Sequence, residues 1–288
     1  MINLNDILEK IDKLPNLSPT VAKVIEVANN LNSTPRELVT VIKMDPVLTG
    51  KVIKLINSSY FALSQEVTSL ERAVIMLGLN TIKNLALSTA VIDQFNSKDF
   101  KLSNFNIDEF WKHSLAVAVG SKILSIAFNV EKKYREEFFI ARLLHDIEKL
   151  IIARYFPNEI NTILHRKQEE NISILTIENQ ELQFSHPEIG EKIADKWKLS
   201  SGLKHSISSH HGIDFSEYKN PDFKLLLSVY ISNYYCVVNN IGFAGDQNPP
   251  ELNPLTWKAI KMTKEQCFEL LAPVTEELNN AMIFLKTN

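Results

Sequence analysis

The sequence predicts an all-α protein, and three observations support this prediction. Apolar residues recur at spacings of three and four, as in Leu38, Val41 and Ile42, which places them on one face of a helix. Signals for the start of a helix are frequent, because a Ser, Thr or Asp is often followed by proline or by a glutamate at the third position. Few segments alternate with period two, so the pattern requires no β-strand.

The first hundred residues predict short helices with clear boundaries. Ser18-Pro19 and Asp45-Pro46 each combine a cap with proline in the first turn, while Thr34–Glu37 and Thr68–Glu71 have the pattern of capping boxes. Gly78 is expected to end a helix or to mark the close approach of a neighbour. This part carries no cluster of chemically useful groups, so we interpret it as a helical packing or interaction module.

The polar stretch at 96–99 is the best candidate for a boundary, and we divide the chain into lobes of residues 1–97 and 98–288. The second lobe is expected to contain longer helices at residues 107–128, 136–156, about 158–180, 186–197, 201–211, 225–238 and 263–285. Residues 239–254 are rich in glycine and proline and are predicted to form a long surface loop.

Composition excludes several functions. Hydrophobic residues make up 45% and charged residues 23% of the 288 residues, as in globular proteins. The net charge of −3 provides no basic field, so nucleic acid is not an expected partner. No apolar run is long enough for a membrane helix, and no signal peptide is evident. Cys236 and Cys267 lack metal-type spacing. We expect a soluble, cytoplasmic protein.

The stretch at 137–156 holds His145 and Asp146 inside an apolar helical pattern. A buried carboxylate is costly unless it is paired or bound to a metal, so this pair requires partners. Candidates are Glu109 and His113 before it, and three histidines after it, His186, His210 and His211. Imidazole and carboxylate together suit Mn, Fe, Ni or Zn. Spacing alone does not show that these segments converge, and each histidine taken alone is better explained as a partly buried residue than as a ligand. The presence of several such histidines shifts that balance toward a site.

Several phrases resemble a known superfamily. FWKHSLAVAV, LLHDIEKL, FSHPEIGEKIADKWKL and SSHH are similar to successive motifs of the HD superfamily of metal-dependent phosphohydrolases. LPNLSP, IKMDPVLTGKVIKLINSSYFAL and VTSLERAVIMLGLNTIKNLAL resemble its HDOD branch, and the resemblance covers about residues 8–240. It implies an all-helical fold in which a small N-terminal lobe packs on an HD-like lobe. It also implies a signalling or regulatory module of bacteria, a class often without demonstrated catalysis.

The resemblance also implies roles for individual residues. Asp146 would bridge two divalent ions and Lys149 would face the substrate phosphate, in a reaction in which metal-bound hydroxide attacks phosphorus. Glu109 matches a carboxylate that helps to hold an additional metal in some cyclic-dinucleotide phosphodiesterases. The remaining implied metal ligands are His113, His145, His186, His210 and His211.

Three departures weaken the enzymatic interpretation. Glu148 replaces the glycine of the usual HDIGK and adds a bulky anion near the site. Asn233 stands where the superfamily has its final aspartate, and a neutral amide is a weaker ligand for a hard cation. HHGIDFSEYKNPDF has no GYP-type sequence after the histidine pair, which argues against the usual cyclic-di-GMP phosphodiesterase.

Three hypotheses follow, and they leave open whether the protein is an enzyme. The first is a regulatory module without catalysis, whose second lobe binds one or two metal ions, a nucleotide-like ligand or nothing, while the first lobe contacts a partner protein. The second is a divalent-metal phosphohydrolase or phosphodiesterase acting on a nucleotide-type phosphoester. The third is an all-helical scaffold whose histidines are structural.

Overall fold

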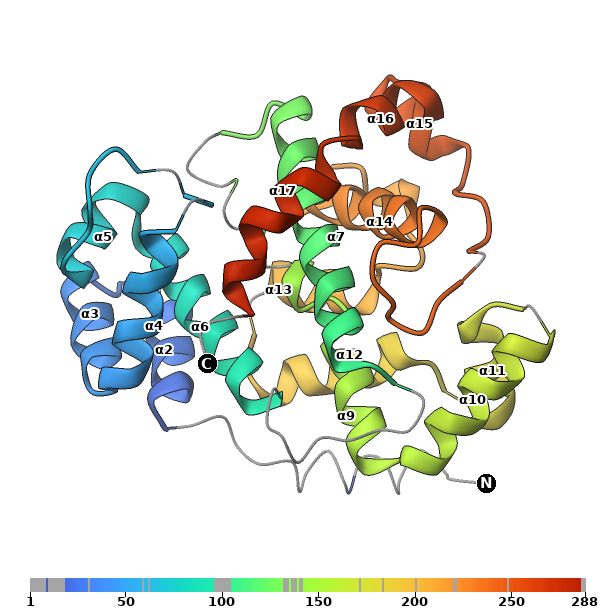
Figure 1. Ribbon diagram of the computed structural model, residues 1–288, viewed down its shortest axis with the longest axis horizontal. Coiled ribbons are helices and arrows are strands. Elements are labelled where there is room, and N and C mark those ends of the chain that lie inside the picture. The colour runs from blue at the N-terminus through green and yellow to red at the C-terminus, as the bar shows by residue number, and fades with distance from the viewer. Residues whose placement is uncertain are drawn as a thin grey trace.

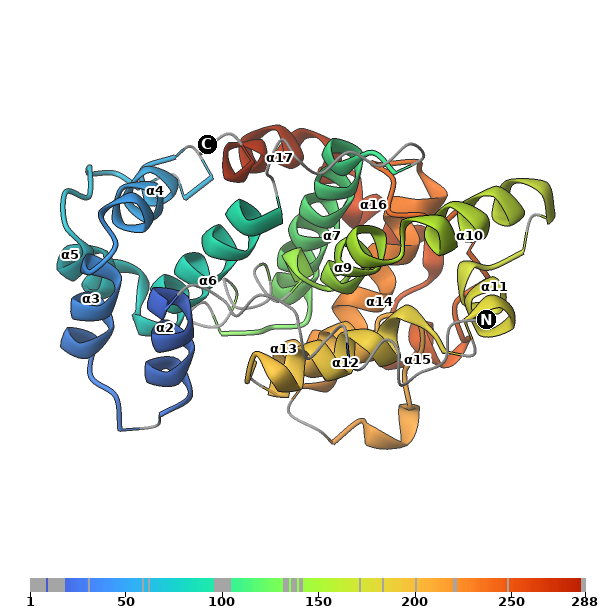
Figure 2. The ribbon, with the colours of Figure 1, turned by 90° about the horizontal axis from the view of Figure 1, so that it is seen from below.

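The computed structural model describes residues 9, 19–30, 32–58, 60–61, 63–95, 105–131, 135, 139, 142–170, 172–182, 184–199, 201–219, 222–247 and 249–285. These residues contain helices and turns but no strand, which confirms the all-α prediction. Figures 1 and 2 show two helical lobes side by side. None of the helices in the described ranges is long and apolar enough to cross a membrane.

The first lobe consists of α2 (Pro19–Asn29), α3 (Pro35–Lys43), α4 (Pro46–Ile56), α5 (Leu70–Leu77) and α6 (Leu79–Phe95). The side chain of Thr34 accepts from the backbone N–H of Glu37, as the predicted capping box requires. Ser69, and not Thr68, caps α5 by accepting from the N–H of Arg72. The other four helices pack on α6, so this lobe has its own apolar centre (Figure 1).

The second lobe is built around one long helix, α7 (Ile107–Ala127), which is buried on nearly all sides. It packs against α14, α16 and α17, while α12 packs against α9 and α13. The elements that follow α7 in the described chain are α9 (Ile147–Tyr155), α10 (Pro157–Glu170), α11 (Ile174–Glu181), α12 (His186–Lys196), α13 (Ser201–Ser208), η1 (Phe215–Glu217), α14 (Phe223–Val238), α15 (Leu255–Ile260), α16 (Lys264–Leu271), α17 (Val274–Ala281) and η2 (Met282–Phe284).

The predicted boundary between residues 97 and 98 lies outside the described residues, since α6 ends at Phe95 and α7 begins at Ile107. Two long helices expected from periodicity are in fact broken. The one expected at 158–180 divides into α10 and α11. The last one is interrupted at Pro273, which has no N–H to continue the ladder between α16 and α17.

The central helix expected at 136–156 is also different. Residues 144–146 form a turn, and α9 begins only at Ile147. The turn is tightened by bonds from each N–H to the carbonyl three residues earlier, from His145 to Arg142 and from Ile147 to Leu144, both at 3.2 Å. Because of this tighter turn, the side chains of His145 and Asp146 point in directions that differ from those they would have in a regular α-helix.

The predicted surface loop after α14 is largely buried at its start. Ile241 and Ala244 belong to the hydrophobic core, and the side chain of Asp246 is only 9% exposed. Gly242 has a φ of +68° and lies so close to α7 that a Cβ on it would be 2.3 Å from the backbone nitrogen of His113. The prediction of a surface loop is therefore wrong for residues 241–246, which lie against α7 at Gly242 and against side chains of α10 and α11 at Gly245.

Candidate metal centre

The histidines and the aspartate singled out in the sequence come together in the middle of the second lobe, where α7, α9, α12 and α13 meet (Figures 1 and 2). The helices each contribute from a different position: α7 from its first half, α12 from its first residue, and α9 and α13 from the turns at their ends. The ligand atoms belong to six side chains, His113, His145, Asp146, His186, His210 and His211.

The first group comprises His113, His145 and Asp146, whose ligand atoms lie within 4.8 Å of one another. Nε2 of His113 lies 2.9 Å from Oδ1 of Asn233, and its Nδ1 lies 3.3 Å from the carbonyl oxygen of Ile241. The amide oxygen of Asn233 thus lies beside Nε2 of His113, on the side of this group where a further ligand would be expected.

The second group comprises Asp146, His186, His210 and His211, again within 4.8 Å. Nε2 of His186 lies 3.2 Å from Nε2 of His210 and 2.9 Å from Nε2 of His211. Oδ1 of Asp146 lies 2.9 Å from Nε2 of His210. Asp146 belongs to both groups, so the two candidate sites share one carboxylate.

Backbone and carboxylate oxygens orient three of the imidazoles. Nδ1 of His145 lies 2.7 Å from the carbonyl of Arg142, and Nδ1 of His210 lies 2.7 Å from the carbonyl of Ile207. Nδ1 of His186 lies 2.7 Å from Oε2 of Glu178. An Nδ1–H that donates outward leaves a lone pair on Nε2, which is the arrangement typical of metal-bound histidine.

Burial sets the charge of the histidines. It lowers the pKa of His113 to about 4, and His145 contributes to this shift. It also lowers the pKa values of His186, His210 and His211, with neighbouring Lys149 or histidines adding to the effect. These four imidazoles are therefore neutral at pH 7, which is the form that binds a metal.

Asp146 remains ionised although it is fully buried. Burial by itself would raise its pKa, but Lys149, His145 and His210 outweigh burial and hold the pKa well below its usual range. Nζ of Lys149 donates to Oδ2 of Asp146 at 3.0 Å. The lysine expected to face substrate is thus part of a buried ion pair, and its own pKa is raised because neighbouring acidic groups, Asp146 first among them, outweigh its burial.

Glu148 does not act as the additional anion that the sequence suggests. Its side chain is fully buried, and Oε2 lies 3.1 Å from the position that a Cβ on Gly190 of α12 would take. Burial, together with the charge of Asp146, raises the pKa of Glu148 well above its usual range. The neutral acid is therefore favoured, and the absence of a side chain at Gly190 provides its space.

Three other predicted or candidate residues lie away from the centre. Glu109 belongs to neither group of ligand atoms among the described residues, and its carboxylate lies 3.5 Å from Nζ of Lys112. His165 pairs with Glu169 on the exposed side of α10. His205 lies 3.4 Å from Asp222, at the edge of the lobe. His165 and His205 thus belong to neither group of ligand atoms among the described residues.

Sequence reasoning did not identify Glu178 or Asp246. Glu178 is buried and accepts from both the backbone N–H and Nδ1 of His186, at 2.9 and 2.7 Å. Oδ2 of Asp246 lies 3.8 Å from Nε2 of His211. Glu178 lies four residues after Ile174, so helical spacing puts it on the apolar face of α11, a signal that the sequence analysis did not use. Asp246 stands in a stretch rich in glycine and proline and has no such signal. Only the packing of α11 and of the loop after α14 brings them inside.

Replacing Glu178 with glutamine should weaken metal binding by about 10- to 100-fold, the usual effect of losing a partner that orients a ligating histidine. Burial raises the pKa of Glu178 to about 8, and a cation on the other face of His186 would favour its ionised form. Titration calorimetry with Zn²⁺ measures the change. Glu181→Gln is the matched control on the same helix, because Glu181 pairs with Arg166 at the surface; equal affinities for all three proteins would exclude the orienting role.

The donor set fits a divalent transition metal. Nε2 of His145 is buried and has no hydrogen-bond partner among the described residues, although its ring is fixed through Nδ1. When Nδ1 of His186 and Nδ1 of His210 donate to Glu178 and Ile207, the Nε2 atoms of both rings carry lone pairs 3.2 Å apart, and a cation between them would remove this repulsion. Neutral imidazoles with one shared carboxylate suit Zn, Ni, Fe or Mn.

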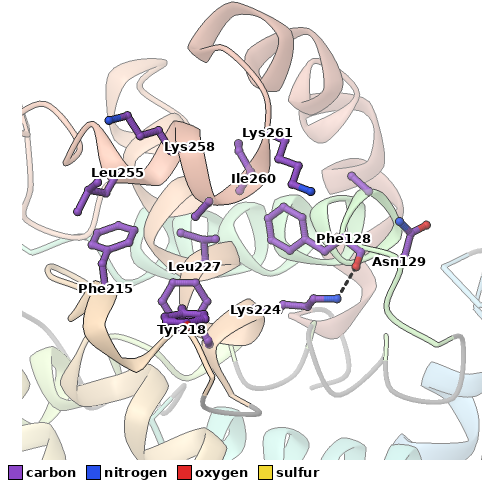
Figure 3. A pocket seen from close by; sticks show the side chains of 13 residues that line it. Phe128, Asn129, Phe215, Tyr218, Lys224, Leu227, Leu255, Lys258, Ile260 and Lys261 are labelled. Carbon is purple, nitrogen blue, oxygen red and sulfur yellow. Dashed lines mark hydrogen bonds between the residues drawn. The ribbon is translucent and has the colours of Figure 1, made fainter.

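An open pocket of about 650 Å³ lies elsewhere, between the end of α7, η1, α14 and α15. Figure 3 shows aromatic side chains and lysines around it, including Phe128, Tyr218 and Lys224. Nζ of Lys224 donates to the carbonyl of Phe128 at 2.8 Å. None of the predicted metal ligands lines this pocket, so it is separate from the metal centre.

Solved structures with the same fold come from several bacteria. An "HDOD domain protein with unknown function" from Geobacter sulfurreducens matches with a TM-score of 0.76 and 24% identity, over 97% of this chain and 95% of that one. A "Putative phosphohydrolase" from Shewanella amazonensis SB2B gives 0.68 and 24%, over 98% and 97%. A "Putative signal transduction protein" from Marinobacter aquaeolei VT8 gives 0.75 and 19%, over 97% and 61%. At these identities the likeness shows the fold.

Sequence comparison agrees with the fold. An "Uncharacterized protein" of Treponema pallidum (strain Nichols) is 22% identical over 215 residues, which are 74% of this chain. The chain spans 41% of the length of that relative. The family model of the HDOD domain matches residues 14–213, which include all of the first lobe's described helices and every residue of the two ligand groups. The chain therefore belongs to the HDOD domain family.

Proposed function

We propose that this chain is a regulatory HDOD module whose second lobe holds one or two divalent metal ions in an enclosed, non-catalytic centre. The observation that carries the proposal is the burial of the ligand set. The side chains of His145, His186 and His210 have no exposed surface, and that of Asp146 is 1% exposed. Catalytic metal sites keep a coordination position open to substrate, and the low exposure of these side chains leaves little access to such a position, although His211 is 15% exposed.

The convergence of ligands supports a metal over purely structural histidines. A structural histidine uses both ring nitrogens in hydrogen bonds to neighbours, because an unpaired buried polar atom is costly. In this centre Nε2 of His145 makes no hydrogen bond in the described part of the chain and lies 3.3 Å from Oδ2 of Asp146, which can only accept, as can the lone pair of Nε2. This arrangement favours a cation as the common partner.

The first lobe is the part that we propose for contact with a signalling partner. Met44, Val47 and Ile75 are 70%, 65% and 84% exposed. Met44 directly follows α3, Val47 lies in α4 and Ile75 lies in α5. An ion pair between Lys43 and Glu71 joins α3 to α5. Exposed apolar side chains on neighbouring helices are typical of surfaces that bind other proteins.

Metal should stabilise the protein if the proposal holds. Adding Mn²⁺, Fe²⁺, Ni²⁺ or Zn²⁺ at a hundredfold excess over the dissociation constant should contribute roughly 2.7 kcal/mol to the free energy of unfolding. For a chain of 288 residues, with an entropy of unfolding of about 2.1 cal/mol/K per residue, that corresponds to a rise in Tm of about 4 to 5 °C. Thermal unfolding of chelator-treated protein measures it. An unchanged Tm with all four metals would contradict the proposal and favour structural histidines.

A second candidate, phosphoester hydrolysis, is favoured by one observation: Asp146 is shared by two ligand groups and is held by Lys149. Bound divalent ions would polarise a phosphoryl oxygen and activate water. Lys149 would supply a positive charge, and its position would be fixed by the hydrogen bond from its Nζ to Oδ2 of Asp146, which is 3.0 Å long. Turnover of a nucleotide or bis(p-nitrophenyl) phosphate by metal-loaded protein, abolished in Asp146→Asn, would establish this function and overturn the non-catalytic one.

A further inference from the structure

A short segment of the loop after α14, residues 241–247, is held at both of its ends by hydrogen bonds to helices near the metal centre. At one end the backbone N–H of Phe243 donates to the carbonyl of Glu109 at 2.9 Å, and the carbonyl of Ile241 lies 3.3 Å from Nδ1 of His113. At the other end Nζ of Lys167 donates to the carbonyl of Gln247 at 2.6 Å. The segment 241–247 therefore spans from α7 to α10 across the centre.

This segment carries one carboxylate, that of Asp246, into the interior. Its side chain is about nine-tenths buried, although the residues around it were expected at the surface. Oδ2 lies 3.8 Å from Nε2 of His211, and Oδ1 lies 3.8 Å from Nζ of Lys167. Lys149 and Asp146 are also near enough to influence its charge. One oxygen thus faces a buried lysine and the other faces the second ligand group.

We propose that Asp246 is an additional carboxylate ligand of the ion held by His186, His210 and His211, an inference that rests on the metal centre proposed above. Two ligand atoms that each lie about 2.1 Å from one ion are separated by roughly 3 to 4 Å. The separation between Oδ2 of Asp246 and Nε2 of His211, 3.8 Å, lies in this range. Asp246 stands outside the group of ligand atoms that lie within 4.8 Å of one another, so its carboxylate would turn toward His186 and His210 to reach the ion.

Charge provides an independent reason. The second group otherwise offers three neutral imidazoles and a share of Asp146, which Lys149 already neutralises in part. Asn233 contributes no charge to the first group. Burying a divalent cation is costly unless anions surround it, and Asp246 brings a second one.

The test uses Co²⁺ as the probe, since its visible absorption reports the number and type of its ligands. Full-length chain and two variants are freed of metal with a chelator and titrated with Co²⁺. Asp246→Asn removes the charge but keeps the shape. Glu251→Gln is the control, because Glu251 lies in the same loop and pairs with Lys264 at the surface. We expect Asp246→Asn to bind at least tenfold more weakly with an altered spectrum, and Glu251→Gln to match the unchanged chain.

Other outcomes overturn the inference in distinguishable ways. Unchanged affinity and spectrum in Asp246→Asn would exclude Asp246 as a ligand while leaving the metal centre intact. A lower Tm of its metal-free form with unchanged Co²⁺ binding would make Asp246 only the partner of Lys167. Failure of the unchanged chain to bind Co²⁺ would remove both proposals. If Asp246→Asn does not fold, Asp246→Glu, which keeps the charge, should retain binding with a shifted spectrum, and an unshifted spectrum overturns the assignment.

Discussion

Replacing Asp146 with asparagine is expected to reduce bound metal to less than a tenth of its normal content. Asp146 is the one residue common to both ligand groups, so its loss weakens both. The substitution also leaves Lys149 buried without its anionic partner, and breaking a buried pair in this way costs about 3 to 5 kcal/mol. Metal analysis by mass spectrometry of freshly purified protein, together with its Tm, measures both effects.

A second variant separates the loss of metal from the loss of stability. His211 is 15% exposed and belongs only to the second group, so His211→Asn should remove about half of the metal and leave the fold largely intact. His165→Asn is the control, because His165 is 67% exposed on α10. Equal metal content in all of these variants would show that any bound ion lies elsewhere.

Replacing Gly242 with alanine should lower the free energy of unfolding by about 3 kcal/mol or more. The left-handed backbone, with φ of +68°, costs an L-residue about 1 to 2 kcal/mol. The added Cβ would also lie 2.3 Å from the backbone nitrogen of His113, and overpacking of this kind costs about 1 to 3 kcal/mol. Because the neighbouring atom is backbone, it has no alternative rotamer through which to relieve the clash.

The same substitution should also weaken metal binding, since the carbonyl of Ile241 faces Nδ1 of His113 and would be displaced with the loop. Chemical denaturation and Zn²⁺ titration measure the two effects. Gly212→Ala is the matched control: Gly212 has no atom within 4 Å of the added Cβ and no positive φ. A stability of Gly242→Ala equal to that of the control would mean that the loop does not pack on α7 as described.

The sequence by itself determined the helical fold and pointed to the residues that form the two candidate ligand groups. The caps at Thr34 and Asp45 are formed by residues adjacent in the chain, so their chemistry is visible without any tertiary contact. The pairing of His145 with Asp146 inside an apolar pattern likewise pointed to a buried site. Periodicity was less informative about interruptions, because the turn at 144–146 and the break at Pro273 keep the apolar spacing on both sides.

Only the tertiary structure decided which polar residues enter the centre. Glu178 and Asp246 are carried there by α11 and by a loop, and burial depends on what packs over a residue rather than on its neighbours in sequence. Glu109, one turn before His113, instead pairs with Lys112 outside the two groups. Glu148 faces Gly190 as a neutral acid because α12 covers it. Local pattern fixes helices, whereas distances between side chains distant in sequence are set by how those helices pack.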